Sequence, residues 1–416
     1  MHPSVVRQIH ASRIFHAIRR NPYASQREIA EKAETDKSTV SAILKDFETA
    51  GLIQRATKVA GKGPGRPGER IALSATGGLL IGIELTPGQI RYVVTGLDGV
   101  PLGQVARSVP HRSELADEVP LGTAELVGKI GREMEEVRAI GISVPGLVGR
   151  DGHLAHSPNF GWRNVKLGEM LRSTLAVPVY IDNNCNADAV AEYMFGSGVD
   201  DETFIYLDSS SGVGCGLFID GSLFRGIGGY AGEFGHAKII PNGRLCRCGN
   251  CGCLSAYVSD FAIAQRLQQD GIQVASVDEV ENLAEAGNGF VLHVLADMGM
   301  HLGIGLANLL NTFNPPLLIL GGSLARLARF ISHTMHHTLE ELTLPAIFEQ
   351  CRVEFSKLAF ADMPRGGIAL ALEGCTSYSG KDATLWQSNT LSPTAEPAAG
   401  LGSAAGGITH SARIAI

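Results

Sequence analysis

Two stretches of the chain repeat the same order of strand-like segments, and this repetition constrains the fold more than any other feature. Each stretch holds three short apolar segments separated by turn signals such as Asp98-Gly99. Helical and strand-like segments follow each triplet, and a recurring unit of this kind predicts two related halves packed side by side. We therefore expect a two-lobed α/β body with a cleft. Its triplets are 79–85, 90–97 and 101–109, and then 203–208, 212–219 and 222–224.

The first 75 residues differ from the rest in the sign of their charge. Residues 1–75 contain 13 Lys/Arg and 7 Asp/Glu, whereas the remaining residues contain 22 and 35, and the whole chain has a net charge of -7. A small basic module on an acidic body indicates that the module alone binds nucleic acid. Chance segregation of charge is the alternative.

The basic module has the pattern of a helix-turn-helix. A first helix covers 5–20, Ser25 and Glu28 form a capping-box signal for a short second helix, and Thr35-Asp36 precede a third. The third helix has an apolar stripe at Val40, Ile43, Leu44 and Phe47. Its opposite, polar face would enter the DNA major groove. The residues expected to contact DNA from this helix are Lys37, Ser38, Thr39, Ser41 and Lys45.

A basic, glycine-rich wing follows the third helix. Residues 52–55 and 70–73 can pair as two strands, and residues 58–68 connect them. Arg66 stands between Gly65 and Pro67, which can present its side chain to a narrow, electronegative minor groove. The alternative is a solvated loop that happens to be basic.

Five separated motifs in the body resemble the ROK family of sugar kinases and sugar-responsive repressors. They follow the family's order between about residues 79 and 375, and a winged module ending in Gly65-Arg66-Pro67 is similar to the head of the repressor branch. The motifs are Gly141–Val148, Pro158–Trp162, Ala231–His236, Cys246–Cys253 and the stretch from Leu302 to Gly322.

The resemblance implies a ribonuclease-H-like fold of the actin and sugar-kinase type behind a winged helix-turn-helix. We expect a DNA-binding domain at 1–75, a ROK effector and oligomerisation domain at 76–376, and a disordered tail at 377–416, where Ser, Thr, Pro, Ala and Gly dominate. A homodimer or homotetramer on a pseudo-palindromic operator is the expected assembly.

A cluster of cysteines predicts a zinc site. Cys246, Cys248, Cys251 and Cys253 lie within eight residues, and His236 precedes them by ten. Zinc favours a tetrahedron of sulfur and nitrogen ligands. By the resemblance the ligands are His236, Cys246, Cys248 and Cys253, and the metal is structural. A four-cysteine site without His236 is the alternative.

Several positions at which this chain departs from the kinases of the family argue against kinase activity. Asn184 stands where the kinases of the family have the aspartate that deprotonates a sugar hydroxyl, and an amide cannot take up that proton. Asp182 and Asp188 lie nearby, and a substitute base at either position is the alternative. The first phosphate loop, Asp-x-Gly-Gly-Thr in the family, reads Glu84-Leu-Thr-Pro-Gly88 here, and the second has Ser210 in place of a glycine. We therefore predict that the protein is not an enzyme.

Residues of the sugar side survive. The resemblance implies that Glu233 and His236 contact sugar hydroxyls, and that Asn159, Asn183 and Asn184 belong to the same site. A glutamate that the family has two residues after the last zinc cysteine is Ser255 here. A body that has lost sugar binding and only dimerises is the alternative.

The cysteine usage favours a reducing compartment, and we expect a cytoplasmic protein. We see no signal peptide and no apolar run of the roughly 18 residues that a membrane helix needs. The predicted function is a DNA-binding regulator, a repressor of carbohydrate genes that responds to a sugar or sugar derivative. The rivals are a sugar kinase with a DNA-binding head and a regulator that needs no ligand.

Overall fold

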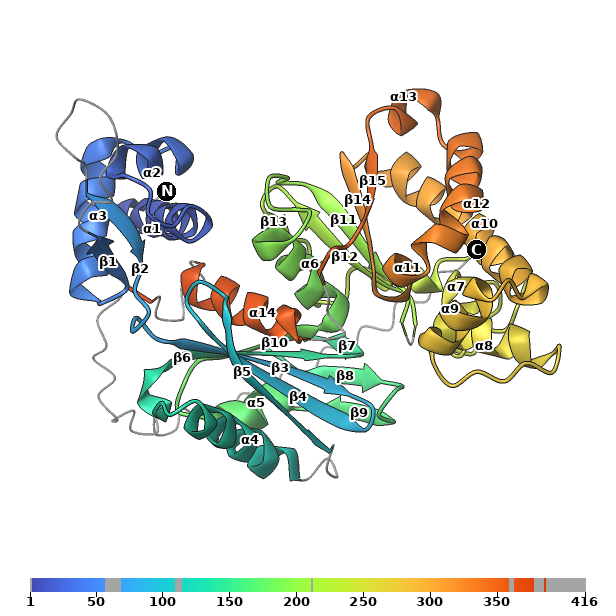
Figure 1. Ribbon diagram of the computed structural model, residues 1–416, viewed down its shortest axis with the longest axis horizontal. Coiled ribbons are helices and arrows are strands. Elements are labelled where there is room, and N and C mark those ends of the chain that lie inside the picture. Colours follow the sequence, from blue (N-terminus) through green and yellow to red (C-terminus); the bar gives the residue numbers. More distant parts are fainter. Residues whose placement is uncertain are drawn as a thin grey trace, which may run out of the picture.

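A computed structural model describes residues 2–56, 69–108, 114–210, 212–358, 363–377 and 385–386. The chain forms a small helical head and two α/β lobes, with the head seated beside the first lobe (Figure 1). The predicted fold class is confirmed. The predicted wing with Arg66 and most of the tail lie outside the described residues.

The head contains three helices and a two-stranded sheet. The elements are α1 (Pro3–Arg20), α2 (Gln26–Lys32), α3 (Lys37–Thr49), β1 (Ile53–Ala56) and β2 (Arg70–Leu73), with β1 and β2 antiparallel. The predicted capping box is present, because the Ser25 side chain accepts from the Glu28 N–H and the Glu28 carboxylate accepts from the Ser25 N–H. The Asp36 side chain caps α3 by accepting from the Ser38 and Thr39 N–H groups.

The first lobe is a five-stranded sheet in the order β10-β6-β3-β4-β5. The helices α4 (Leu115–Lys129) and α5 (Leu167–Arg172) cover one face, and α14 (Arg365–Thr376) lies across the other (Figure 1). A small sheet of β7 (Leu147–Val148), β8 (Leu154–Ser157) and β9 (Trp162–Val165) adjoins it. The large sheet consists of β3 (Leu79–Thr86), β4 (Gln89–Gly96), β5 (Pro101–Ser108), β6 (Val137–Val144) and β10 (Val179–Asn183).

The second lobe repeats this arrangement. Its sheet has the order β13-β12-β11-β14-β15, with an antiparallel β11–β12 pair and parallel β11–β14 and β14–β15 pairs, as in β3–β4, β3–β6 and β6–β10. The duplication predicted from the strand triplets is therefore confirmed. The strands are β11 (Phe204–Asp208), β12 (Gly214–Ile219), β13 (Ser222–Leu223), β14 (Leu317–Gly321) and β15 (Arg352–Phe355).

Helices enclose the second sheet on both faces. On one face α6 (Asn184–Phe195) packs against β11 and β12 and also contacts α14. The remaining helical elements are η3 (Glu233–His236), α7 (Ser255–Val258), α8 (Asp260–Gln268), α9 (Val277–Glu285), α10 (Gly289–Phe313), α11 (Gly322–Arg326), α12 (Ala328–Leu342) and α13 (Pro345–Phe348).

By length and composition, helix α10 is apolar enough to cross a membrane, which corrects the expectation that the chain has no such run. It has 25 residues, and 61% of its most apolar window is buried inside the protein. Its apolar side chains belong to the core of the second lobe, together with those of α12. We therefore assign α10 as a core helix.

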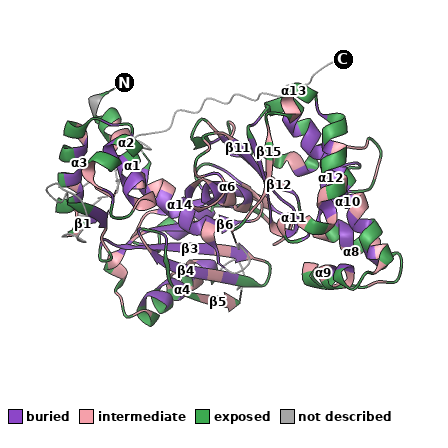
Figure 2. Ribbon diagram, turned by 45° about the horizontal axis from the view of Figure 1, so that its top comes forward, coloured by how far each residue is buried: buried purple, intermediate pink, exposed green. Residues whose placement is uncertain are grey.

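One continuous apolar core joins the head to the body. The buried residues of α1 and α3, such as Phe15 and Phe47, belong to the same cluster as Ala189 and Met194 of α6 and Ile368 of α14. Figure 2 shows buried residues continuing from the head through α14 and α6.

Two residues of the expected disordered tail also contribute to this core. The Trp386 ring lies 5.3 Å from that of Phe47 and 6.2 Å from that of Phe15, its indole N–H donates to Gln8, and the Leu385 N–H donates to Cys375. The prediction of a tail without ordered contacts therefore does not hold at these two residues, because an aromatic pair in the head receives the tryptophan.

Candidate functional site: an inter-lobe cavity beside a metal-type cluster

A cavity of about 790 Å³ lies between the lobes. This volume falls within the range of small-molecule sites, which is about 300–1,000 Å³. The small sheet β7–β9 lines one side, the start of α6 lines the floor, and β12 and η3 line the opposite side. All five predicted ligand residues line the cavity: Asn159, Asn183, Asn184, Glu233 and His236.

Asn183 and Asn184 lie at the junction of β10 and α6. The Asn183 side chain caps α6 by accepting from the Cys185 N–H at 2.8 Å, and it donates to the Gly146 carbonyl at 2.7 Å. Both ends of this amide are therefore used by the protein itself, so Asn183 shapes the cavity. Asn184 is the first residue of α6 and lines the same cavity.

Glu233 and His236 come from the single turn η3. The turn begins after Gly232, whose φ is +95° and where a Cβ would lie 2.0 Å from the Cys215 carbonyl oxygen. Only glycine fits such a close approach with a left-handed backbone. The Glu233 carboxylate lies 3.8 Å from Nε2 of His236, and burial raises the pKa of Glu233.

Three basic side chains also line the cavity and were missed in the sequence. His156 and Arg163 are paired across β8 and β9, and Arg247 extends from the cysteine loop, where it stacks over Phe261 at 4.9 Å. In the sequence, only their position in or near the family motifs pointed to these residues. The pairing between β8 and β9, which the sequence does not show, places His156 and Arg163 on the same cavity.

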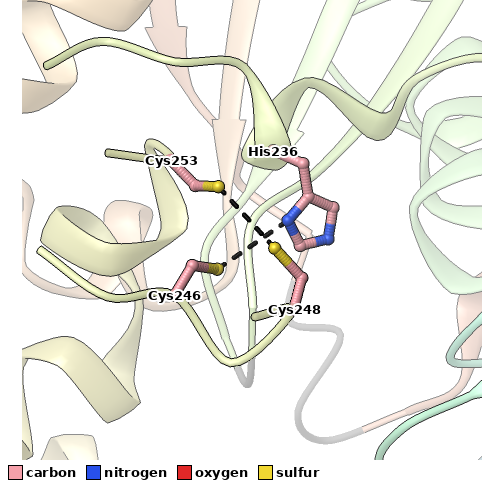
Figure 3. Close-up of side chains that lie close together, drawn as sticks. All are labelled: His236, Cys246, Cys248 and Cys253. Carbon is pink, nitrogen blue, oxygen red and sulfur yellow. Dashed lines mark hydrogen bonds between the residues drawn. The ribbon is translucent and has the colours of Figure 1, made fainter. Parts of the chain in front are cut away.

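The predicted metal ligands converge beside the cavity (Figure 3). The ligand atoms of His236, Cys246, Cys248 and Cys253 all lie within 4.8 Å of one another. Cys248 and Cys253 have their sulfurs 3.7 Å apart, and Cys246 Sγ lies 3.8 Å from His236 Nδ1. Two sulfurs bonded tetrahedrally to one zinc at about 2.3 Å are about 3.8 Å apart. The donor set and its spacing therefore fit zinc.

Cys251 does not belong to this cluster. It is exposed, and its backbone pairs with Leu245. The geometry thus favours His236 over the four-cysteine alternative. His236 directs Nδ1 toward Cys246 and Nε2 toward Glu233, which links the metal-type cluster to the cavity. Lys238 Nζ donates to Cys253 Sγ at 2.7 Å.

Neither candidate substitute for the missing base reaches the cavity. Asp182 accepts from Asn186 at 2.8 Å and from Arg225 at 2.7 Å. Asp188 faces α14, where its carboxylate would be 2.6 Å from a Cβ on Gly366. Burial, with the neighbouring carboxylates of Asp208 and Glu84, raises the pKa of Asp188. Neither residue is among those that line the cavity.

The two predicted phosphate loops differ in position. The first is a tight hairpin in which Thr86 pairs with Gln89 across Pro87 and Gly88, and it lies outside the cavity lining. Glu84 forms an ion pair with Arg91 on the neighbouring strand. The second loop does line the cavity through Asp208, Ser210 and Gly212. Ser255, in place of the family's glutamate, is buried and donates to the Gly235 carbonyl at 2.9 Å.

The polar face of α3 is open to solvent. Lys37, Ser38, Ser41 and Lys45 are exposed and Thr39 is half-buried, whereas Val40, Ile43, Leu44 and Phe47 are buried on the opposite face. The predicted division of α3 into a packing face and an outer face is therefore present.

Comparison with known proteins identifies the class to which this fold and site belong. The ROK family model matches residues 80–373, and the MarR family model matches residues 7–63 of the head. The chain belongs to the ROK family, with a MarR-type winged helix-turn-helix in front of the ROK body. This is the family that the sequence motifs indicated.

Individual relatives are transcriptional regulators. The xylose repressor of Bacillus subtilis (strain 168) is 30% identical over 77% of this chain and 83% of its own length. The DNA-binding transcriptional dual regulator NagC of Escherichia coli (strain K12) is 26% identical over 85% of this chain and 90% of its own. The crystal structure of a ROK family transcriptional regulator, described as a homolog of E. coli MLC protein, has a TM-score of 0.78, 23% identity, and coverage of 89% and 97%.

Proposed function

We propose that this protein represses carbohydrate genes in response to a sugar or sugar derivative held in the inter-lobe cavity. The observation that carries the proposal is the joining of a winged helix-turn-helix to a ROK body in which Asn159, Glu233 and His236 converge on one cavity. A xylose repressor and an N-acetylglucosamine repressor are similar to this chain over 83% and 90% of their own length, which supports the proposal.

For DNA binding, we assign the outer face of α3 to the major groove. Lys37, Ser38, Thr39, Ser41 and Lys45 would contact DNA, with the residues of the first turn of α3 nearest the base edges. Arg66 would enter the adjacent minor groove. Arg66→Ala should weaken binding by roughly 1–3 kcal/mol in a titration of operator DNA. Unchanged affinity at physiological salt would remove the wing from the mechanism.

We propose zinc as the resident metal, held by His236, Cys246, Cys248 and Cys253. Four protein ligands leave no open position for water, so bound zinc supplies folding energy to the cysteine loop. The same loop lines the cavity through Cys246 and Cys248. The metal would therefore hold one side of the ligand site in place.

We further propose that the protein is not a kinase, although it retains the fold of one. Asn184 cannot accept the proton of a sugar hydroxyl, and the first phosphate loop lies outside the cavity lining. The protein would act in the cytoplasm as a homodimer or homotetramer, because two heads are needed to bind the two half-sites of a pseudo-palindromic operator.

Direct measurement of DNA binding tests this function. A duplex selected by the purified protein from a random library is titrated with and without D-xylose and N-acetylglucosamine, the sugars named for two relatives. A sugar should raise the Kd for DNA and also raise the melting temperature of the protein. Failure to select any DNA would refute the proposal. Sugar-dependent ATP consumption in a coupled assay would favour a kinase with a DNA-binding head instead.

A further inference from the structure

A single helix, α6, extends from the cavity to the DNA-binding head. It contains 12 residues, Asn184–Phe195, so its axis is about 18 Å long. The first residues of α6 line the cavity, and the last residues contact α1 of the head. In Figure 1, α6 lies next to α14, between the first lobe and the second sheet.

The cavity end of α6 is fixed by Asn183. This side chain caps the helix through the Cys185 N–H and ties it to the loop at Gly146, as described above. Asn184, Cys185 and Asn186 all line the cavity. A ligand that fills the cavity must therefore contact, or displace water from, the first turn of α6.

Two arginines of α1 contact the head end of α6. Arg19 donates to the Met194 carbonyl at 2.8 Å, and Arg20 donates to the Tyr193 carbonyl at 3.2 Å. Both guanidinium groups also lie over aromatic rings of α6, Arg19 over Phe195 at 4.9 Å and Arg20 over Tyr193 at 5.1 Å. Cations at the carboxyl end of a helix interact favourably with its dipole and its unpaired carbonyls.

Between these ends α6 is packed as a rigid element. Eight of its residues are buried, and its aromatic side chain at Tyr193 stacks on Phe218 of β12 with the ring centroids 4.4 Å apart. Close-packed helices shift as units because well-packed interiors transmit strain. A displacement of the first turn therefore reaches the last turn.

We propose that α6 transmits occupancy of the cavity to the DNA-binding head through Arg19 and Arg20. The identity of the signal, a sugar in the cavity, rests on the proposed function. The competing routes are the covalent connection Ser74–Gly78 between β2 and β3 and the packing of the head against α14. The routes differ in prediction, because only transmission through α6 depends on the side chains of Arg19 and Arg20.

A double-mutant cycle tests the route without any sugar. The full-length protein, Asn183→Ala, Arg19→Ala/Arg20→Ala and the triple variant are each titrated with the same selected DNA duplex. Asn183→Ala removes the cap at the cavity end and should change the Kd for DNA by about 5-fold or more, the lower range of allosteric coupling. In the background without the two arginines the change should fall below about 2-fold.

Matched control variants distinguish a loss of coupling from misfolding of the protein. Arg7→Ala removes another α1 arginine, which pairs with Asp46 of α3 inside the head. It should leave the effect of Asn183→Ala intact. Arg19→Lys/Arg20→Lys retains both charges without the planar guanidinium groups and should show an intermediate loss of coupling, with an unchanged melting temperature.

The outcomes separate this inference from the proposed function. An equal change of Kd in both backgrounds, or no change from Asn183→Ala in the unmodified protein, overturns transmission through α6. In a second arm, D-xylose and N-acetylglucosamine are added to each variant. If neither sugar alters DNA binding by the unmodified protein, the proposed response to these sugars fails, and the cycle still decides the role of α6. A sugar response that is retained in the variant without the two arginines also overturns transmission through α6.

Discussion

The two sides of the inter-lobe region differ in whether their predicted ligand residues line the cavity. On the side predicted to bind a sugar, called the sugar side, Asn159, Glu233 and His236 line a common cavity, and the metal-type cluster lies beside it. On the phosphate side, the first loop is a closed hairpin outside the cavity lining, and Glu84 is engaged with Arg91. The residues predicted to bind a sugar therefore line one cavity together with the second predicted phosphate loop, whereas the first predicted phosphate loop lies apart from them.

The largest expected effect concerns the metal on the sugar side. Cys248→Ser should release zinc and destabilise the body by several kcal/mol, because metal binding energy is folding energy. Metal content and thermal unfolding measure both effects. Cys251→Ser is the matched control and should retain one zinc per chain. Zinc lost from Cys251→Ser but retained by His236→Ala would establish the four-cysteine site.

The next prediction tests whether a carboxylate beside the sugar side is enough to create kinase activity without the phosphate side. Asn184→Asp introduces a carboxylate at the position predicted for the kinase base, and a general base typically contributes about 10²–10⁴-fold to rate. It should not create sugar-dependent ATP hydrolysis, because the hairpin with Pro87 lies outside the cavity lining and would not position phosphate there. A coupled assay with a sugar panel gives the measurement. Phosphorylation by the unmodified protein or by this variant would remove the distinction between the two sides.

A pair of carboxylates compares the two sides directly. Glu233→Ala should abolish a sugar-induced change in DNA affinity, which for allosteric regulators is about 5–150-fold, while DNA binding without sugar remains. Glu84→Gln, on the phosphate side, should leave the sugar response intact. Titration of DNA with and without sugar measures both variants. An unchanged response in Glu233→Ala would place the effector outside this cavity.

The smallest expected effect concerns the contact between the head and α14. His16 accepts from or donates to Thr376 of α14 at 3.1 Å, and burial, with the nearby Arg19 and Arg20, holds its pKa well below the usual value. His16 is thus neutral in the folded protein and binds fewer protons there than in the unfolded chain. Its contribution is present above the usual histidine pKa of about 6.5 and is lost as the pH falls below it.

Thermal unfolding between pH 7.5 and 5 measures this effect. The unmodified protein should lose stability toward pH 5, and His16→Gln should show a shallower dependence on pH. His10, which lies near Thr35 inside the head, provides the matched control. Identical slopes for the unmodified protein and His16→Gln would exclude His16 as the source.

Local spacing in the sequence predicted much of the fold and the site. The capping box at Ser25 and Glu28, the apolar stripe of α3 and the strand triplets are short-range patterns, and the structure contains each of them. The family motifs then supplied the long-range convergence of His236 with the three cysteines. Cys251 could not be excluded by spacing, because only the fold of the loop turns its side chain away.

Other features depended on contacts between residues far apart in the chain. These contacts connect elements that share no local sequence pattern. They are the hydrogen bonds from Arg19 and Arg20 to α6, the ion pair of Asp182 with Arg225, and the packing of Trp386 against the head. The sequence by itself determined which helices and strands form and which ligand types are present, because hydrogen bonding and apolar periodicity act over a few residues. Only tertiary packing decided which of those side chains meet, since the core that joins head and body is built from all of them at once.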